Sequence, residues 1–237
     1  MANLVRTKWG EGLLAATDRQ SSRVDLVSIV NNTEIWECIH DERSALATTW
    51  EGLGPADWST TSWCGEWSVK VVAGHVLAAA EQTIPNFFKE FVLAGFRFDV
   101  FADRAAHRLA KEQPEELIRR LRARTATTNR PPAPVVVMLG EVIVHGEDIR
   151  RPLGIAHQVA RSSLMAVADN YVKTNVLLGA KRRIAGLRLQ ATDVDWAHGS
   201  GPQVTGPLLS LIQAMSGRSW ALTDLEGPGA AVMTSRG

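Results

Sequence analysis

The residues with the clearest chemical potential are a glutamate and a histidine four positions apart, Glu141 and His145. On an α-helix, positions i and i+4 share one face, so both side chains can reach one metal ion. On a strand they would lie roughly 13 Å apart, too far for a single ion. Val and Ile are frequent around the pair and keep the strand alternative open, but the length of the segment from Pro134 to Arg150 favours a helix.

Spacing alone does not identify a site. The chain holds 14 Glu and 6 His, so about 0.35 such pairs are expected by chance, and Asp103 and His107 form a second pair of the same geometry. Glu141 and His145 stand among Val, Ile and Met, whereas Asp103 and His107 stand beside arginines, as on a solvated face. An ionised carboxylate in apolar surroundings is costly unless a partner or a metal compensates it. A simple ion pair in the core remains the alternative to a metal site.

His75 offers a third ligand, in the middle of the apolar segment VVAGHVLAAA. A lone histidine there is commonly a hydrogen-bonded core residue. Together with Glu141 and His145, however, it would give two histidines, one glutamate and an open position, as in catalytic zinc sites. Asp148 follows His145 by three residues and is suited to orient its imidazole, the alternative being a surface charge paired with Arg151.

Composition excludes several classes of protein. Lys and Arg total 26 against 25 Asp and Glu, and 45% of the residues are hydrophobic, so neither a disordered chain nor a basic nucleic-acid binder is indicated. Two cysteines cannot form a disulfide framework, and Cys64 is interpreted as a small buried hydrophobe. No signal peptide and no apolar run of the roughly 18–20 residues that cross a bilayer is found, so a cytoplasmic protein without membrane or nucleic-acid partners is expected.

Periodicity predicts a helical protein with a smaller α+β unit at its end. We expect an N-terminal extension over residues 1–32, either a mobile arm or a segment that the core does not need. A helical bundle is expected over 33–180 and a small α+β domain over 181–237. The helices are predicted over residues 33–53, 68–85, 86–109, 114–124, 135–151 and 160–178. Alternation at Leu187, Leu189 and Ala191 predicts a strand, a Gly-rich turn separates two more, and Pro207 opens a last helix.

Two segments, WSTTSWCGEWSVKVVAGHV and GEVIVHGEDIRRPLG, resemble the signature stretches of the mycothiol-dependent maleylpyruvate isomerase family. The resemblance implies a mainly α fold, a DinB-like four-helix bundle of the metal-dependent thiol S-transferase superfamily. In that family a His on the second helix and a Glu and a His on the fourth hold the metal, and these match His75, Glu141 and His145. Residues 188–229 resemble the family's small C-terminal domain, which is related to sterol-carrier proteins.

The implied cofactors are a divalent metal, with zinc expected, and mycothiol or a similar small thiol. The implied function is an isomerase or S-transferase in which the metal activates the thiol for attack on a small electrophile. The alternative is a non-catalytic metal- or ligand-binding regulatory or interaction module on the same bundle. The chain reads Cys64-Gly65-Glu66-Trp67 where the family usually has Cys-Pro-Gly-Trp, and this departure favours the alternative.

Three arginines are candidates for binding the thiol or the substrate. Arg150 and Arg151 lie one to two turns beyond His145, although a solvated C-terminal turn explains at least one of them better. Arg218 follows the last predicted helix and could reach into a cleft between the two domains. The sequence does not define the oligomeric state.

Overall fold

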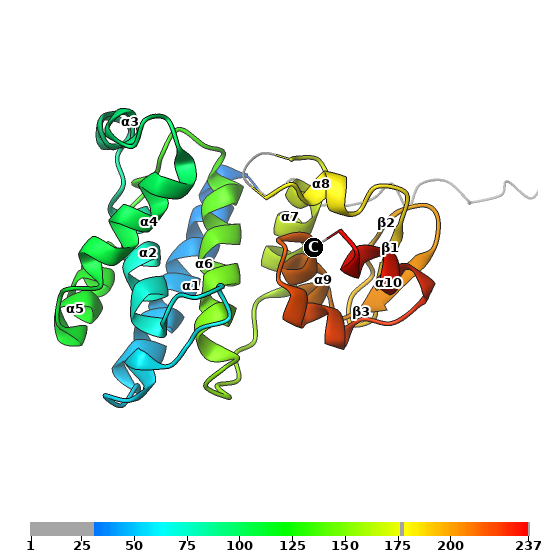
Figure 1. Ribbon diagram of the computed structural model, residues 1–237, viewed down its shortest axis with the longest axis horizontal. Coiled ribbons are helices and arrows are strands. Elements are labelled where there is room, and N and C mark those ends of the chain that lie inside the picture. Colours follow the sequence, from blue (N-terminus) through cyan, green and yellow to red (C-terminus); the bar gives the residue numbers. More distant parts are fainter. Residues whose placement is uncertain (1–30, 176–177, 237) are drawn as a thin grey trace, which may run out of the picture.

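The structure, a computed structural model, describes residues 31–175 and 178–236. It is mainly helical, with a bundle joined to a smaller unit that contains a three-stranded sheet (Figure 1), which confirms the fold class predicted from the sequence. The helices of the first part are α1 (Asn32–Glu51), α2 (Val69–Glu81), α3 (Ile84–Leu93), α4 (Phe98–Leu109), α5 (Pro114–Arg124), α6 (Val135–Arg150) and α7 (Arg161–Tyr171). Within the described residues, no helix is long and apolar enough to cross a membrane.

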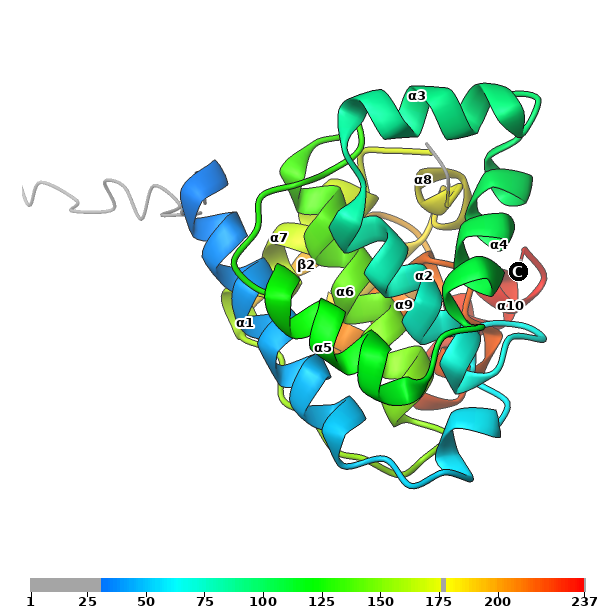
Figure 2. The same ribbon diagram turned by 90° about the vertical axis from the view of Figure 1, so that its left-hand side faces the viewer.

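The bundle consists of α1, α2, α5 and α6, which lie side by side in Figure 2, with α4 packed against α2. Its core contains fully buried aliphatic and aromatic side chains from all four helices, among them Trp50, Leu77, Leu117 and Ile143. Helix α1 begins one residue before the predicted start at residue 33. Asn31 caps α1, and Glu34 returns a bond to the Asn31 amide in a capping box.

The predicted helix over residues 86–109 is interrupted. The chain leaves α3 through Gly95 and Phe96, both with φ near +60°, and only then enters α4. Left-handed backbone cannot continue an α-helix, so α3 turns away and lies across one end of the bundle (Figure 2). Pro85, expected to end the preceding helix, instead stands in the first turn of α3, where its missing N–H costs no hydrogen bond.

Gly74 allows α4 to approach α2 closely. A Cβ atom at this position would lie 2.5 Å from the carbonyl oxygen of Ala106, so Gly74→Ala is expected to destabilise the protein by about 1–3 kcal/mol. Urea unfolding measures the loss. Gly52→Ala is the control, because its Cβ would meet its nearest neighbour, the carbonyl oxygen of Thr49, at an ordinary 3.5 Å. Equal midpoints for the two variants would contradict the close approach.

The smaller unit contains α8 (Ala180–Arg183), α9 (Leu208–Met215), α10 (Pro228–Thr234) and three short strands. The strands are β1 (Arg188–Ala191), β2 (Ala197–Gly199) and β3 (Gln203–Gly206). β1 is the central strand, antiparallel to β2 and parallel to β3. As the alternation predicted, Leu189 and Ala191 are buried while Arg188 is exposed. Two 3-10 helices, Asp57–Ser59 and Ser219–Asp224, complete the regular elements.

Helix α7 connects the two parts. It ends at Tyr171 rather than continuing to residue 178 as predicted, and it packs against both α6 and α9. The indole of Trp196 donates a 2.9 Å hydrogen bond to Asp169 on α7. The boundary at residue 180 therefore stays a prediction. Of the extension predicted over residues 1–32, all but the last two residues lie outside the described part of the chain.

Candidate metal centre

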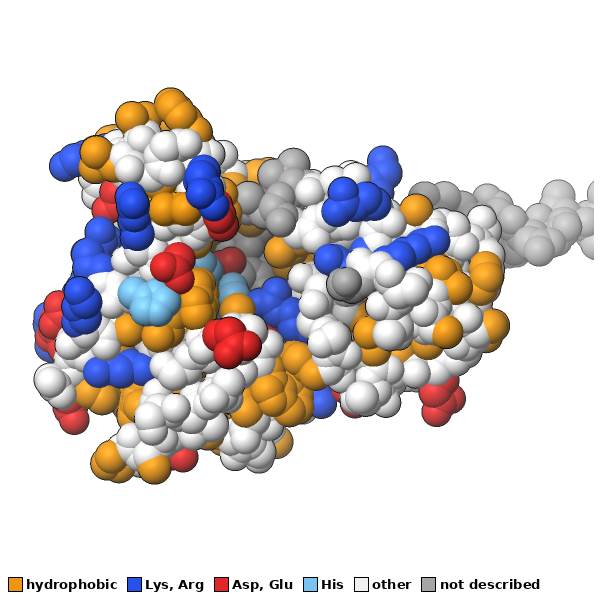
Figure 3. Space-filling model, viewed as in Figure 1, with side chains coloured by type: hydrophobic (Ala, Val, Ile, Leu, Met, Phe, Trp, Pro, Cys, Tyr) orange, Lys and Arg blue, Asp and Glu red, His pale blue; other side chains and the backbone are white. Residues whose placement is uncertain are grey.

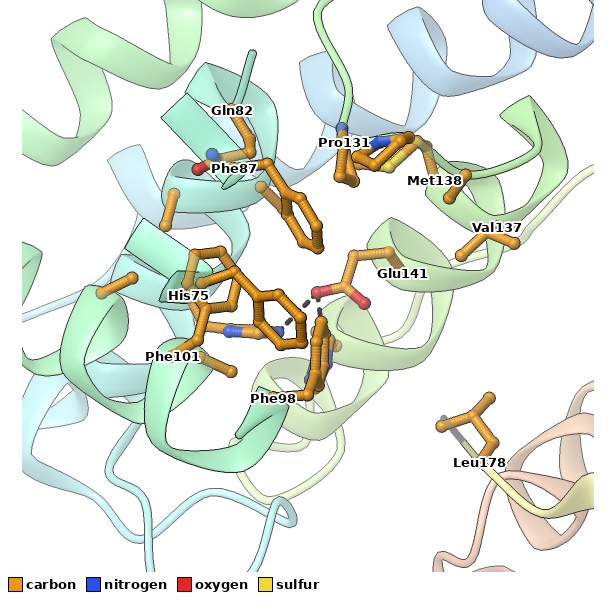
Figure 4. Close-up of a pocket in the computed structure, with 18 residues that line it drawn as sticks. His75, Gln82, Phe87, Phe98, Phe101, Pro131, Val137, Met138, Glu141 and Leu178 are labelled. Atoms are coloured by element: carbon orange, nitrogen blue, oxygen red, sulfur yellow. Dashed lines mark ion pairs between the residues drawn. The ribbon is translucent and has the colours of Figure 1, made fainter. Parts of the chain in front are cut away.

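The three predicted metal ligands come together from two neighbouring helices. His75 lies on α2, and Glu141 and His145 lie one turn apart on α6, as the i and i+4 spacing requires (Figure 4). Oε1 of Glu141 is 2.6 Å from Nε2 of His75 and 3.5 Å from Nε2 of His145. The two imidazole rings stand edge to face with centroids 4.7 Å apart. All three donor atoms thus converge on one small volume.

The carboxylate of Glu141 fits a metal site better than a hydrogen-bonded pair. Among the described residues, its Oε1 atom is buried and has no partner with hydrogen-bond geometry, although both histidines are near. Burial acts to raise the pKa of Glu141, but the charges of His75 and His145 outweigh it and bring the pKa to about 2. The result is an ionised oxygen and two imidazoles directed at a common point, a donor set that suits a divalent ion such as zinc.

A buried ion pair stands behind His145. Nδ1 of His145 is 2.9 Å from Oδ2 of Asp148, whose side chain is fully buried. Arg218 reaches the same carboxylate from the smaller unit, with Nη2 at 2.7 Å from Oδ2 and Nε at 3.2 Å from Oδ1. Burial opposes ionisation of Asp148, but the hydrogen bond from His145 and the charge of Arg218 lower its pKa. Asp148 therefore holds a proton on Nδ1 of His145 and leaves Nε2 free to face Glu141.

Cys64 lies next to this ion pair but is not a reactive thiolate. Its sulfur is 3.6 Å from Nη2 of Arg218. Burial and the negative charge of Asp148 nevertheless raise the pKa of the Cys64 thiol to about 12, against the opposing effect of Arg218. Its Sγ could join His145 and Asp148 in a second donor set, but Asp148 is already bound to both His145 and Arg218. The thiol is thus unreactive, as the sequence interpretation implies, but it is half-buried rather than fully buried.

Trp67 lies next to the candidate centre, a position that the sequence analysis did not assign to it. Its ring centroid lies 5.3 Å from that of His75, and its Nε1 donates a 3.3 Å hydrogen bond to Asp103. Asp103 and His107 form the competing pair, at 3.1 Å, with side chains about half exposed at 54% and 51%. The Asp103–His107 pair is thus a solvated ion pair that holds the indole of Trp67 by a hydrogen bond, and it does not form a second buried metal site.

The other candidate arginines do not reach the centre. Arg150 is buried against α1, where its Nε donates to Thr49. Arg151 is 3.3 Å from Glu147 and 3.2 Å from Asp224. Among Arg150, Arg151 and Arg218, the structure brings only Arg218 to the site.

The two residues that depart from the family motif, Gly65 and Glu66, lie outside the candidate centre. Glu66 is exposed and lies outside both sets of possible ligands. Gly65 has a φ of +59°, a conformation that proline cannot adopt, so the loop before α2 cannot carry the family's proline at this position. The acidic side chain therefore changes the loop surface without entering the site.

A cavity of about 420 Å³ opens beside the three candidate ligands (Figure 4). Four phenylalanines that the sequence analysis did not single out form much of its wall: Phe87 and Phe91 from α3, and Phe98 and Phe101 from α4. Their spacing of three or four residues along each helix was the available signal. On the face shown in Figure 3, a hollow lies between the bundle and the smaller unit, with histidine atoms at its floor.

Comparisons with known proteins find one matching family model and two solved structures of similar fold. Residues 39–150 match the family model of the mycothiol maleylpyruvate isomerase N-terminal domain. Crystal structures of the mycothiol-dependent maleylpyruvate isomerase and of its histidine-to-alanine mutant each share 13% identity with the chain at a TM-score of 0.59, covering 84% of this chain and 94% of the other. That likeness shows a common fold. A comparison of the sequence with curated proteins found no match. Residues 39–150 are therefore similar to the mycothiol maleylpyruvate isomerase N-terminal domain, and most of the chain shares the fold of the solved isomerase.

Proposed function

We propose that this chain is an isomerase or S-transferase that uses a divalent metal, with zinc as the expected ion, and a mycothiol-like small thiol to act on a small electrophile. The observation that carries the proposal is the convergence of His75, Glu141 and His145 around a buried carboxylate oxygen without a hydrogen-bond partner among the described residues. Two imidazoles and one carboxylate are a ligand set of catalytic zinc sites, which keep a coordination position open.

A divalent ion held by these residues would lower the pKa of a coordinating thiol, so that thiolate is available near neutral pH. The chain's own residues have separate tasks. Asp148 fixes the tautomer and orientation of His145, and Arg218 compensates the charge of Asp148. The adjoining cavity can hold the electrophile away from bulk water.

The choice of thiol rests on the relatives. The matched family and the two solved structures are named for mycothiol, and the motifs around His75 and His145 follow the same family. Neither the geometry nor the spacing distinguishes one small thiol from another, so mycothiol is the first thiol to test.

Metal removal and restoration test the proposal. The purified protein is expected to contain about one equivalent of divalent metal. Dialysis against a chelator should abolish thiol-dependent turnover of an electrophile, and zinc should restore it. A full metal equivalent without turnover by any thiol would favour the non-catalytic binding module. A metal-free protein whose turnover is unchanged by chelator and zinc would contradict the metal-dependent mechanism.

A further inference from the structure

The cavity beside the candidate metal centre is largely apolar, and no Lys or Arg is among the described residues that line it. Apart from the three candidate ligands, its wall consists of aromatic rings, aliphatic side chains, three consecutive residues of a Pro-rich loop and one glutamine. These residues are Ala78, Ala79, Gln82, Phe87, Phe91, Phe98, Phe101, Ala102, Ala105, Pro131, Pro132, Ala133, Val137, Met138 and Leu178. Glu141 is the one carboxylate in this wall, so a divalent ion held beside it would leave one positive charge at the candidate ligands and none along the aromatic part of the wall.

Three arginines near the cavity already have partners. Arg130, which precedes the Pro-rich loop of the wall, donates to the carbonyl oxygens of Pro131 and Ala133. Arg218 holds Asp148 from the far side of His145, and Arg151 bridges Glu147 and Asp224. A substrate carboxylate that enters the cavity would lose its water shell. Away from the three candidate ligands, it would find no cationic side chain among the described residues of the wall. Burying an ionised carboxylate without a partner costs several kcal/mol. Even if one carboxylate of a dicarboxylic acid reached a metal ion, the other would lie among aromatic rings.

The aromatic wall is suited instead to a flat, uncharged group. The rings of Phe87 and Phe101 stand edge to face with centroids 5.3 Å apart, and those of Phe98 and Phe101 are tilted by 48° with centroids 5.8 Å apart. Edge and face contacts of this kind are favourable for aromatic ligands. A volume of about 420 Å³ lies within the usual range of small-molecule sites.

We propose that the electrophile of this protein is an uncharged, apolar molecule of aromatic size, bound among Phe87, Phe91, Phe98 and Phe101, rather than a dicarboxylate. The inference rests on the proposed function, since it names the substrate class of that same centre. The turnover test below uses the addition of a thiol to an alkene. The sulfur forms a bond to one alkene carbon, and the π electrons form a C–H bond at the neighbouring carbon. The proton for that bond is the one that the thiol loses to the buffer.

Ligand binding tests the cavity without turnover. The neutral fluorophore N-phenylnaphthylamine is expected to bind the metal-loaded and the chelator-treated protein, and nitrobenzene but not maleate should displace it. Phe87→Ala should weaken binding about tenfold, because one aromatic contact is lost. Phe88→Ala is the matched control, since Phe88 neighbours it on α3 but is 54% exposed and outside the cavity wall. Equal losses for the two variants, or displacement by maleate as effective as by nitrobenzene, would overturn the inference.

Turnover of two substrates that differ in charge is a second test of the inference. With the thiol and metal held constant, dimethyl maleate and maleate share one carbon skeleton and differ in charge. The rate enhancement over the uncatalysed addition is expected to be about a hundredfold larger for the ester, and Ala102→Arg in the cavity wall should narrow that ratio. A larger enhancement for maleate would overturn the inference. If neither compound turns over, the proposed function fails, while the displacement measurements still decide the nature of the cavity.

Discussion

Replacing His75 with alanine is expected to reduce bound divalent metal from about one equivalent to below about 0.1, and thiol-dependent turnover by about a thousandfold or more. The reason is geometric, because His75 is the one candidate ligand on α2, and its Nε2 lies 2.6 Å from Oε1 of Glu141. Glu141→Gln should act similarly, since it keeps the shape of the side chain but removes the charge that favours a cation. Metal analysis after gel filtration measures the first effect, and initial rates measure the second.

Thermal unfolding provides a readout independent of turnover. A ligand that binds only the folded state stabilises it by about 2.7 kcal/mol at a hundredfold excess over Kd. Added zinc should therefore raise the Tm of the chelator-treated wild type but not that of the His75 or Glu141 variants. His107→Ala is the matched control, because Asp103 and His107 have the same spacing as Glu141 and His145 but lie half exposed. Loss of metal in the control, or its retention in His75→Ala, would disprove the assignment.

Much of the candidate centre follows from local sequence rules. A helix between Pro134 and Pro152 necessarily places Glu141 and His145 on one face, and an apolar helix before it supplies His75. The strand of the small unit was equally predictable, because Leu189 and Ala191 alternate with polar residues. In each case the signal is contained within one element.

The parts that could not be predicted depend on contacts between distant elements. The spacing from His145 indicates Asp148, but nothing near Arg218, which is 70 residues from Asp148, distinguishes it from Arg150 or Arg151. The break between α3 and α4 depends on positive φ at Phe96, which only Gly95 beside it hints at. Because that break folds α3 across the end of the bundle, the aromatic cavity was not foreseen either.

Arg218→Met is expected to lower the free energy of unfolding by about 3–5 kcal/mol, because it leaves the carboxylate of Asp148 buried without its charged partner. Asp148→Asn should in turn weaken metal binding by about 10–100-fold, since the amide no longer holds His145 as a carboxylate does. Urea unfolding in chelator separates the first effect from metal linkage, and zinc titration measures the second.

The double variant distinguishes a buried ion pair from simple loss of packing. If the cost of Arg218→Met arises from the unpaired charge of Asp148, adding Asp148→Asn should recover part of the lost stability, although it removes a further ionic group. If the arginine mattered only through its aliphatic stem, the two losses would add. Arg119→Met is the control, because its exposed pair with Glu116 is expected to leave stability unchanged. If the double variant is more stable than Arg218→Met while Arg119→Met stays unchanged, the ion pair between Arg218 of the smaller unit and Asp148 of α6 stabilises the protein through its charge. The same carboxylate of Asp148 orients His145.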